Sequence, residues 1–130
     1  MRKELSPKSI PDPRPRYTQG ILAEGKRLLF IAGQTGVDAD NNVVGKGDVA
    51  AQTEQVLKNM KAVLDEAGAS FADIVKITTY ITDPRFRDGL NPARLKYFGD
   101  NPPASTLVVV SGLADPDYLV EIEAIAVLPD

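Results

Sequence analysis

The sequence predicts an α+β domain in which two helices cover one face of a mixed sheet of about six strands. Two segments have the apolar spacing of helices, while the remaining apolar segments are short and rich in β-branched residues. The strands and helices come in the order β-β-(β)-α-β-α-β-β, without an internal repeat. The chain of 130 residues, 43% hydrophobic and 25% charged, can form one domain with a real core.

The N-terminal residues 1–15 differ from the rest because they contain Pro7, Pro11, Pro13 and Pro15 among basic side chains. Proline fixes φ and removes a hydrogen-bond donor, so this segment is predicted to be an extended basic arm. A solvated tail, or an arm packed on a neighbour, is favoured over a nucleic-acid contact. The single folded domain is then expected to cover residues 16–130.

The first half of the domain should contain two strands and one long helix. Strands are expected at 16–23 and 27–33, joined by a turn at 24–26. The Gly- and Asp-rich loop that follows (33–48) could hold a short strand at Val43-Val44, but it lacks the glycine and glutamate of a calcium loop. Asp48 is a good N-cap and Gly68 a good C-cap, so a helix is predicted over about 48–67.

The second half should contain a strand, a short helix and two further strands. Residues 74–81 are β-branched and aromatic, with Val75, Ile77, Thr79 and Ile81 on one face. Asn91 and Pro92 are expected to cap and begin a helix whose apolar side includes Leu95 and Phe98. The last two strands are placed at 105–110 and about 119–127.

The strand at 105–110 suggests that the protein assembles. Its residues 107–110 are all apolar, which is typical of a strand that is buried on both faces. Two helices can cover only one face of the sheet. We therefore expect another subunit to cover the other face.

The residue types that are missing exclude several kinds of chemistry. There is no Cys and no His, so the sequence rules out thiolate nucleophiles, zinc sites built from these residues and Ser-His-Asp catalysis. We expect neither a metal nor another cofactor. The net charge of −3 argues against a general nucleic-acid surface. With no apolar membrane span and no signal-peptide pattern, a cytoplasmic location is expected.

Two carboxylates in the last strand are the most informative charged residues. Glu121 and Glu123 are two apart and therefore share a face, while Val120, Ile122, Ala124 and Ala126 occupy the face suited to packing under helices. Burial of an unpaired carboxylate is costly. The pair could form a structural salt bridge across a subunit interface, or one glutamate could hold a water in a cleft between subunits.

Several stretches together resemble the reactive intermediate deaminase (Rid) family, also called the YjgF-type or L-PSP family. They are YTQG (17–20), FIAGQTG (30–36), AAQTEQVLKNMKAVLDEAGAS (50–70), DIVKITTYITD (73–83) and VEIEAIAV (120–127). The resemblance covers about residues 16–128. It implies a chorismate-mutase-like fold, a homotrimer, and small-molecule clefts between subunits.

The resemblance also implies a set of site residues. In active members, the glutamate matching Glu121 helps to position the water that hydrolyses imines of amino acids to keto acids and ammonia. The ligand-binding positions that we carry over or infer are Tyr17, Ala32, Gly33, Gln34, Asn91, Ser105, Thr106 and Leu107.

Some of these positions have simpler explanations. Tyr17 could be an ordinary strand residue, and Asn91 is first of all a helix cap. Gly33 could either permit a turn or offer its backbone amide to a ligand.

One position departs from the family pattern. The deaminases of the family have an arginine directly after a Pro-Ala pair, and this chain has Ser105 there. A guanidinium group binds a carboxylate with two charge-assisted hydrogen bonds, which a hydroxyl cannot replace. We therefore expect a substrate other than 2-iminopropanoate, such as one without a carboxylate beside the imine. Arg94, in another Pro-Ala-Arg triplet, is expected to be a solvated helix residue.

The leading function is hydrolytic deamination of a small imine or enamine. The alternatives are a non-catalytic small-molecule-binding trimer, which is favoured by Ser105, and an endoribonuclease of the L-PSP type. The acidic pI of about 5.0 and the lack of His place the ribonuclease third.

Overall fold

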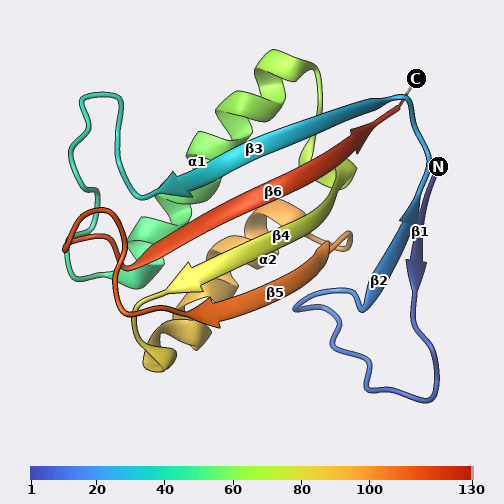
Figure 1. The fold of residues 1–130 in the computed structure, drawn as a ribbon, viewed down its shortest axis with the longest axis horizontal. Coiled ribbons are helices and arrows are strands. Elements are labelled where there is room, and N and C mark those ends of the chain that lie inside the picture. The colour runs from blue at the N-terminus through green and yellow to red at the C-terminus, as the bar shows by residue number, and fades with distance from the viewer. Residues whose placement is uncertain (130) are drawn as a thin grey trace.

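A computed structural model describes residues 1–129, and in it two helices pack against one face of a four-stranded sheet (Figure 1). A separate two-stranded sheet, formed near the N-terminus, lies at the end of the larger sheet where its last strand finishes and its other three strands begin. The strands are β1 (Arg2–Leu5), β2 (Gly20–Ala23), β3 (Arg27–Thr35), β4 (Ile74–Ile81), β5 (Ala104–Val109) and β6 (Val120–Leu128). The α-helices are α1 (Val49–Ala67) and α2 (Asn91–Phe98), and short 3-10 helices are η1 (Phe71–Asp73) and η2 (Pro84–Leu90).

The strand number and the α+β class agree with the prediction, but the strands form two sheets. The larger sheet has the order β3-β6-β4-β5 and is mixed, because β4 and β5 run parallel while the other pairs are antiparallel. Strand β2 begins only at Gly20 and pairs with β1, so Tyr17 precedes the strand in which it was expected. The arm residues 2–5 thus form a strand of their own.

The N-terminal segment is also held to the edge of the larger sheet. Thr18 forms a bridge with Ala104, its backbone N–H donates to the Pro103 carbonyl (3.0 Å), and its hydroxyl donates to the Pro102 carbonyl (2.8 Å). Thr18 is almost fully buried. These contacts fix the residues before β2 against the start of β5.

Helix α1 confirms the predicted caps. The Asp48 side chain accepts a hydrogen bond from Ala51 N (3.1 Å), and Gly68 has the left-handed φ of 72° that suits a residue without Cβ. Gln52 on this helix is fully buried, which its type does not suggest. Its amide group reaches the carbonyls of Gly45 and Asp117 and accepts from Leu119 N (2.9 Å), so it joins two loops to the helix.

Helix α2 forms where it was predicted, but Asn91 is not its N-cap. Asn91 is already helical and its backbone N–H donates to Asp88 O, because η2 runs directly into α2. The capping carboxylate lies upstream at Asp83, which accepts from Arg85 N (2.8 Å). Leu95 was expected on the buried side of α2, but it is 47% exposed, while Phe98 is buried as predicted.

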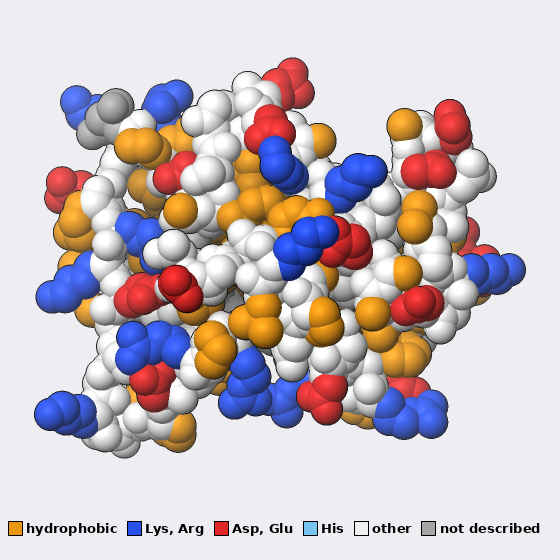
Figure 2. All heavy atoms as spheres, turned by 180° about the vertical axis from the view of Figure 1, so that it is seen from behind, with side chains coloured by type: hydrophobic (Ala, Val, Ile, Leu, Met, Phe, Trp, Pro, Cys, Tyr) orange, Lys and Arg blue, Asp and Glu red, His pale blue; other side chains and the backbone are white. Residues whose placement is uncertain are grey.

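The two faces of the larger sheet differ. Strand β6 alternates as predicted, so that the residues Val120, Ile122, Ala124 and Ala126 are buried under the helices. In β4 an irregularity after Ile74 buries that residue, whereas Val75 stays half-buried. Figure 2 shows the helical side, where acidic and basic side chains are interspersed with hydrophobic ones.

The other face has no helix over it. The apolar side chains of Leu28 and Phe30 are 58% and 68% exposed there, and their register partners in β6 are Val127 and Ile125. Val108 of β5, whose partner in β4 is Tyr80, is also exposed. We call this the open face, defined by Leu28, Phe30, Val108, Glu121 and Glu123.

Candidate functional site

The predicted site residues, with the exception of Thr106, fall into two groups on different sides of the larger sheet. One group surrounds Glu121 on the open face, and the other lines a cavity on the helical side of β5. No side chain of the first group lines that cavity. A single chain therefore does not bring the predicted site together at one point.

The Glu121 side chain lies against an irregularity in the neighbouring strand, although its own register partner there is Thr35. Residues 32 and 33 form a bulge in β3, because the register with β6 shifts between Ile31 and Gln34. A methyl group on Gly33 would collide with the Glu121 carboxylate. The absence of a side chain at Gly33 therefore leaves room for the Glu121 carboxylate. This role differs from the two that were expected, which were to permit a turn or to offer a backbone amide to a ligand.

The two glutamates of β6 have different surroundings. Glu123 accepts a hydrogen bond from the Tyr80 hydroxyl (2.6 Å), and this bond, together with burial and the charges of both glutamates, raises the pKa of Tyr80. Glu121 is half-buried, and among residues 1–129 it has neither a hydrogen-bond partner nor an ion pair. Within one chain the pair forms no salt bridge, and only Glu121 has its carboxylate free for a ligand or water.

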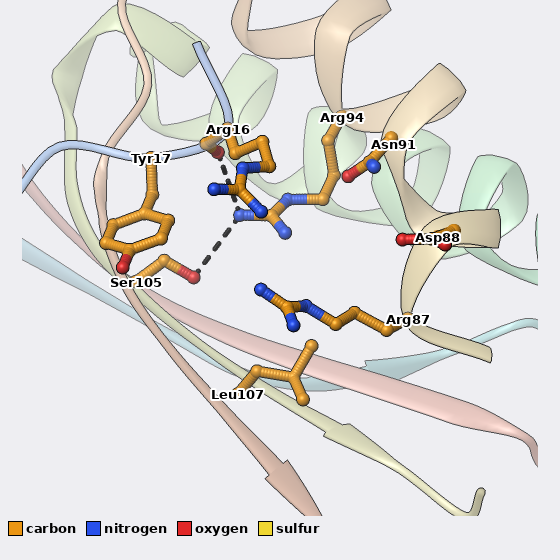
Figure 3. Close-up of a pocket in the computed structure, with 8 residues that line it drawn as sticks. All are labelled: Arg16, Tyr17, Arg87, Asp88, Asn91, Arg94, Ser105 and Leu107. Carbon is orange, nitrogen blue, oxygen red and sulfur yellow. Dashed lines mark hydrogen bonds between the residues drawn. The ribbon is translucent and has the colours of Figure 1, made fainter. Parts of the chain in front are cut away.

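The cavity on the helical side has a volume of about 300 Å³ (Figure 3). Ser105 and Leu107 of β5 point into it because they are in register with Ile77 and Thr79, which face the helices. The cavity is lined by Arg16, Tyr17, Arg87, Asp88, Asn91, Arg94, Ser105 and Leu107. Its floor is therefore a strand edge, and its walls come from η2, α2 and the segment before β2.

Arg94 is not a solvated helix residue, as was expected, but reaches into this cavity. Its Nη2 donates to Ser105 Oγ (3.3 Å) and to the Arg16 carbonyl (3.1 Å), while its Nε is buried without a partner among the described residues. Burial lowers the pKa of Arg94, and the positive charges of Arg16 and Arg87 lower it further. The guanidinium group thus comes from α2 to the position beside Ser105.

All but one of the remaining predicted residues belong to one of the two groups. Ala32 and Gln34 flank Gly33 in β3, and the Gln34 amide donates to the Ala32 carbonyl (3.0 Å). Tyr17 and Asn91 line the cavity together with Ser105 and Leu107. Thr106 belongs to neither, because it points to the open face, where Lys76 Nζ donates to its hydroxyl (2.5 Å).

The sequence reasoning missed Arg16, Arg87 and Asp88. A signal was available for one of them, because Arg87, Asn91 and Arg94 are spaced by four and three residues and so share one side of a helical segment. For Arg16 the sequence offers no comparable signal, since a long-range contact brings it to β5.

Residues 1–129 contain no group of three or more acidic side chains close enough together to hold a metal ion. No helix within those residues has the length and apolar character required to cross a bilayer.

The fold and the glutamate-bearing last strand define an α+β protein of a known family. The family model described as endoribonuclease L-PSP matches residues 7–128. A RutC family protein of Pyrococcus horikoshii is 41% identical over 97% of this chain and 98% of its own length. The crystal structure of a protein of the conserved Rid family from Yersinia pestis is 36% identical, with a TM-score of 0.91 and coverage of 98% of both chains.

The chain belongs to the Rid family, also called the YjgF or L-PSP family. A further relative is a Mycobacterium tuberculosis protein of the YjgF/YER057c/UK114 family, which is 30% identical with a TM-score of 0.68, over 98% of this chain and all of its own. Its fold agrees with the arrangement of helices and strands described above.

Proposed function

We propose that the protein is a hydrolytic deaminase that converts a small imine or enamine into the carbonyl compound and ammonia. The observation that carries this proposal is the half-buried, unpartnered carboxylate of Glu121 against the bulge at Gly33. Membership of the Rid family supports it. Glu123 does not have the same freedom, because the Tyr80 hydroxyl already occupies one of its oxygens.

In this mechanism Glu121 accepts a hydrogen bond from a water molecule and takes up its proton as the water oxygen adds to the imine carbon. Glu121 passes this proton to the nitrogen, so that the carbon carries a hydroxyl and an amine. Transfer of the hydroxyl proton to the nitrogen, again through Glu121, then breaks the carbon–nitrogen bond, so that ammonia leaves and the carbonyl forms. Water is the only co-reactant, so no oxidant or reductant is required.

The reaction would take place in a homotrimer, in a cleft between subunits. Two features support an assembly: the exposed apolar side chains of the open face, and the placement of Glu121 and the cavity on different sides of one sheet. A neighbouring chain packed on the open face would bury Leu28 and Phe30. It would also allow the cavity of one subunit to meet the Glu121 of another.

One observation favours a second function, a binding protein without catalysis. Ser105 occupies the position at which the deaminases of the family have an arginine. A chain that kept the cleft and lost its anchor for the substrate carboxylate could act as a small-molecule-binding trimer.

The test compares Glu121→Gln with Glu123→Gln in an assay of imine hydrolysis. Imino acids are formed in the cuvette from a panel of amino acids by an oxidase, and the release of keto acid is followed. We expect Glu121→Gln to lower the rate by about 10²-fold or more, which is typical for loss of a general base. Glu123→Gln, the matched control on the same face, should change it far less. Equal effects of the two variants, or no hydrolysis of any imine by the wild type, would contradict the proposal.

A further inference from the structure

Positive charge dominates the cavity behind β5. Its lining contains the guanidinium groups of Arg16, Arg87 and Arg94 and only one carboxylate, that of Asp88. The arginines come from three different segments of the chain, and Figure 3 shows their side chains converging on the same space. Like charges brought this close destabilise the empty protein unless an anion or water separates them.

None of these three arginines forms an ion pair with another described residue. By contrast, Arg14 and Arg85, which lie close to them in the sequence, are paired with Asp12 and Asp83. The bonds of Arg94 use only its Nη2, to a hydroxyl and a backbone carbonyl. Its Nη1 makes no hydrogen bond to the described residues and is not among the buried unpartnered atoms, so a ligand can reach it.

The positive groups are arranged around two positions. Arg94 and Arg16 lie beside Ser105, and the guanidinium group of Arg87 lies on the Leu107 side of the cavity (Figure 3). Ser105 and Leu107 are two residues apart in a strand, so their Cα atoms are roughly 6 to 7 Å apart along the floor of the cavity. A single phosphate or carboxylate does not extend over that length of the floor, whereas a short dicarboxylate does.

We propose that this cavity binds a small dicarboxylate, with one carboxylate held by Arg94 and Arg16 beside Ser105 and the other held by Arg87 beside Leu107. A planar carboxylate fits the fork of a guanidinium group. Two carboxylates also offset the excess positive charge of the side chains that line the cavity. The volume of about 300 Å³ suits a small ligand. Leu107 and the Tyr17 ring offer apolar contacts to the carbon chain between the carboxylates.

Taken with the proposed function, on which this step rests, the substrate is the imine of a 2-oxo dicarboxylic acid. Arg94 then supplies from α2 the anchor that Ser105 does not supply from β5. This reverses the expectation that the substrate lacks a carboxylate beside the imine, which was based on Ser105 alone.

The test is calorimetric titration of the whole protein, at low salt, with succinate as an unreactive dicarboxylate. Propionate, succinamide and inorganic phosphate serve as probes with one charge, no charge and a single charged centre. We expect succinate to bind at least about tenfold more tightly than any of them, because each charge-assisted contact strengthens binding by about tenfold or more. Phosphate binding more tightly than succinate would overturn the dicarboxylate assignment.

The variants Arg16→Gln and Arg87→Gln test the residues, because both side chains belong to exposed positions and their loss should not unfold the chain. Each should weaken succinate binding by about tenfold or more. The matched control is Arg85→Gln, which removes the same charge from the same 3-10 helix at a side chain that is 86% exposed and directed to Asp83. Equal weakening by Arg85→Gln and Arg87→Gln would overturn the proposal.

The same titration on Glu121→Gln separates this inference from the proposed function. Succinate binding that survives in this variant and depends on Arg87 supports the dicarboxylate site, even if no imine is hydrolysed by the wild type. Conversely, if the wild type hydrolyses imines through Glu121 but succinate neither binds nor competes, the deaminase stands and the dicarboxylate site is refuted.

Discussion

The surroundings of Glu121 and the cavity behind β5 are built in different ways. At Glu121 the backbone provides the space: a one-residue bulge and a glycine leave room for a carboxylate on the open face. In the cavity long side chains from three segments reach the same space, and the backbone contributes only the floor at β5. The first kind of site is sensitive to small added groups, and the second is sensitive to charge.

The open face provides the largest expected effect. Phe30→Glu places a charge at the most exposed apolar side chain of that face, which is 68% exposed in the single chain. If a second subunit covers it, burial of an unpaired charge should convert the assembly fully to monomers at micromolar concentration. Light scattering coupled to gel filtration measures the mass.

The control for this variant is Leu95→Glu, at an apolar residue of α2 that is 47% exposed on the helical side. It should leave the oligomeric state unchanged. A wild-type protein that is already monomeric would contradict the trimer, and with it the cleft between subunits.

Gly33→Ala should have the next largest effect. The new methyl group collides with the Glu121 carboxylate, which must then move away from its position beside the bulge. We expect kcat for imine hydrolysis to fall by about 10- to 100-fold, since a displacement of about 1 Å can lower a rate by that amount. Binding of succinate in the cavity should stay the same.

Gly112→Ala is the matched control, because a Cβ at that position meets no atom within 4 Å. If Gly33→Ala retained the full rate, the position of Glu121 would not be important for the reaction. The statement that the Glu121 site is sensitive to small added groups would then be wrong.

Ser105→Arg tests whether the cavity behind β5 is sensitive to charge. The resemblance alone suggests that restoring this arginine should raise the hydrolysis of 2-iminopropanoate. The structure gives no reason to expect such a gain, because Arg94 Nη2 lies 3.3 Å from Ser105 Oγ. A second guanidinium group at position 105 would be crowded against that of Arg94 and would disturb the binding of a carboxylate. We expect succinate binding to weaken by about tenfold, and the double variant Ser105→Arg with Arg94→Ser to regain most of it. Tighter binding in the single variant would contradict this account.

The smallest effect concerns pH. Hydrogen bonds from Arg85 lower the pKa of Asp83 from 3.8 to about 2, and this carboxylate caps the helix that carries Arg87. Because the pKa is lower in the folded state, the stabilisation is present above pH 3.8 and is lost as the pH falls toward 2. Chemical denaturation should show this loss in the wild type and a smaller loss in Asp83→Asn. Parallel pH profiles of the two proteins would contradict the capping role.

Most of the fold could be predicted because its signals are local. Asp48 and Gly68 define the ends of α1, and the alternation of β6 separates Glu121 from the buried side chains on its other face. The helix at Asn91 and Pro92 is present, but the capping role of Asn91 was wrong because the 3-10 helix before it continues directly into α2, and no residue pattern distinguishes such a continuation from a cap.

Local sequence signals also predicted one part of the site. Glu121 and Gly33 belong to motifs that are continuous in the sequence, although the reason for Gly33 became visible only from its contact with Glu121. The role of Arg94 depends on the packing of α2 against β5, which brings its guanidinium group to Ser105 across eleven residues. An arginine on a short helix is usually solvated, so only the three-dimensional arrangement could identify this one.

The pairing of β1 with β2 has a practical consequence for anyone who shortens the protein. Residues 1–15 resemble a dispensable tail, yet their removal would strip β2 of its partner strand and expose a row of free backbone amides and carbonyls. Such an unpaired edge promotes association between molecules. A trimmed version could therefore precipitate for reasons that have nothing to do with its active centre.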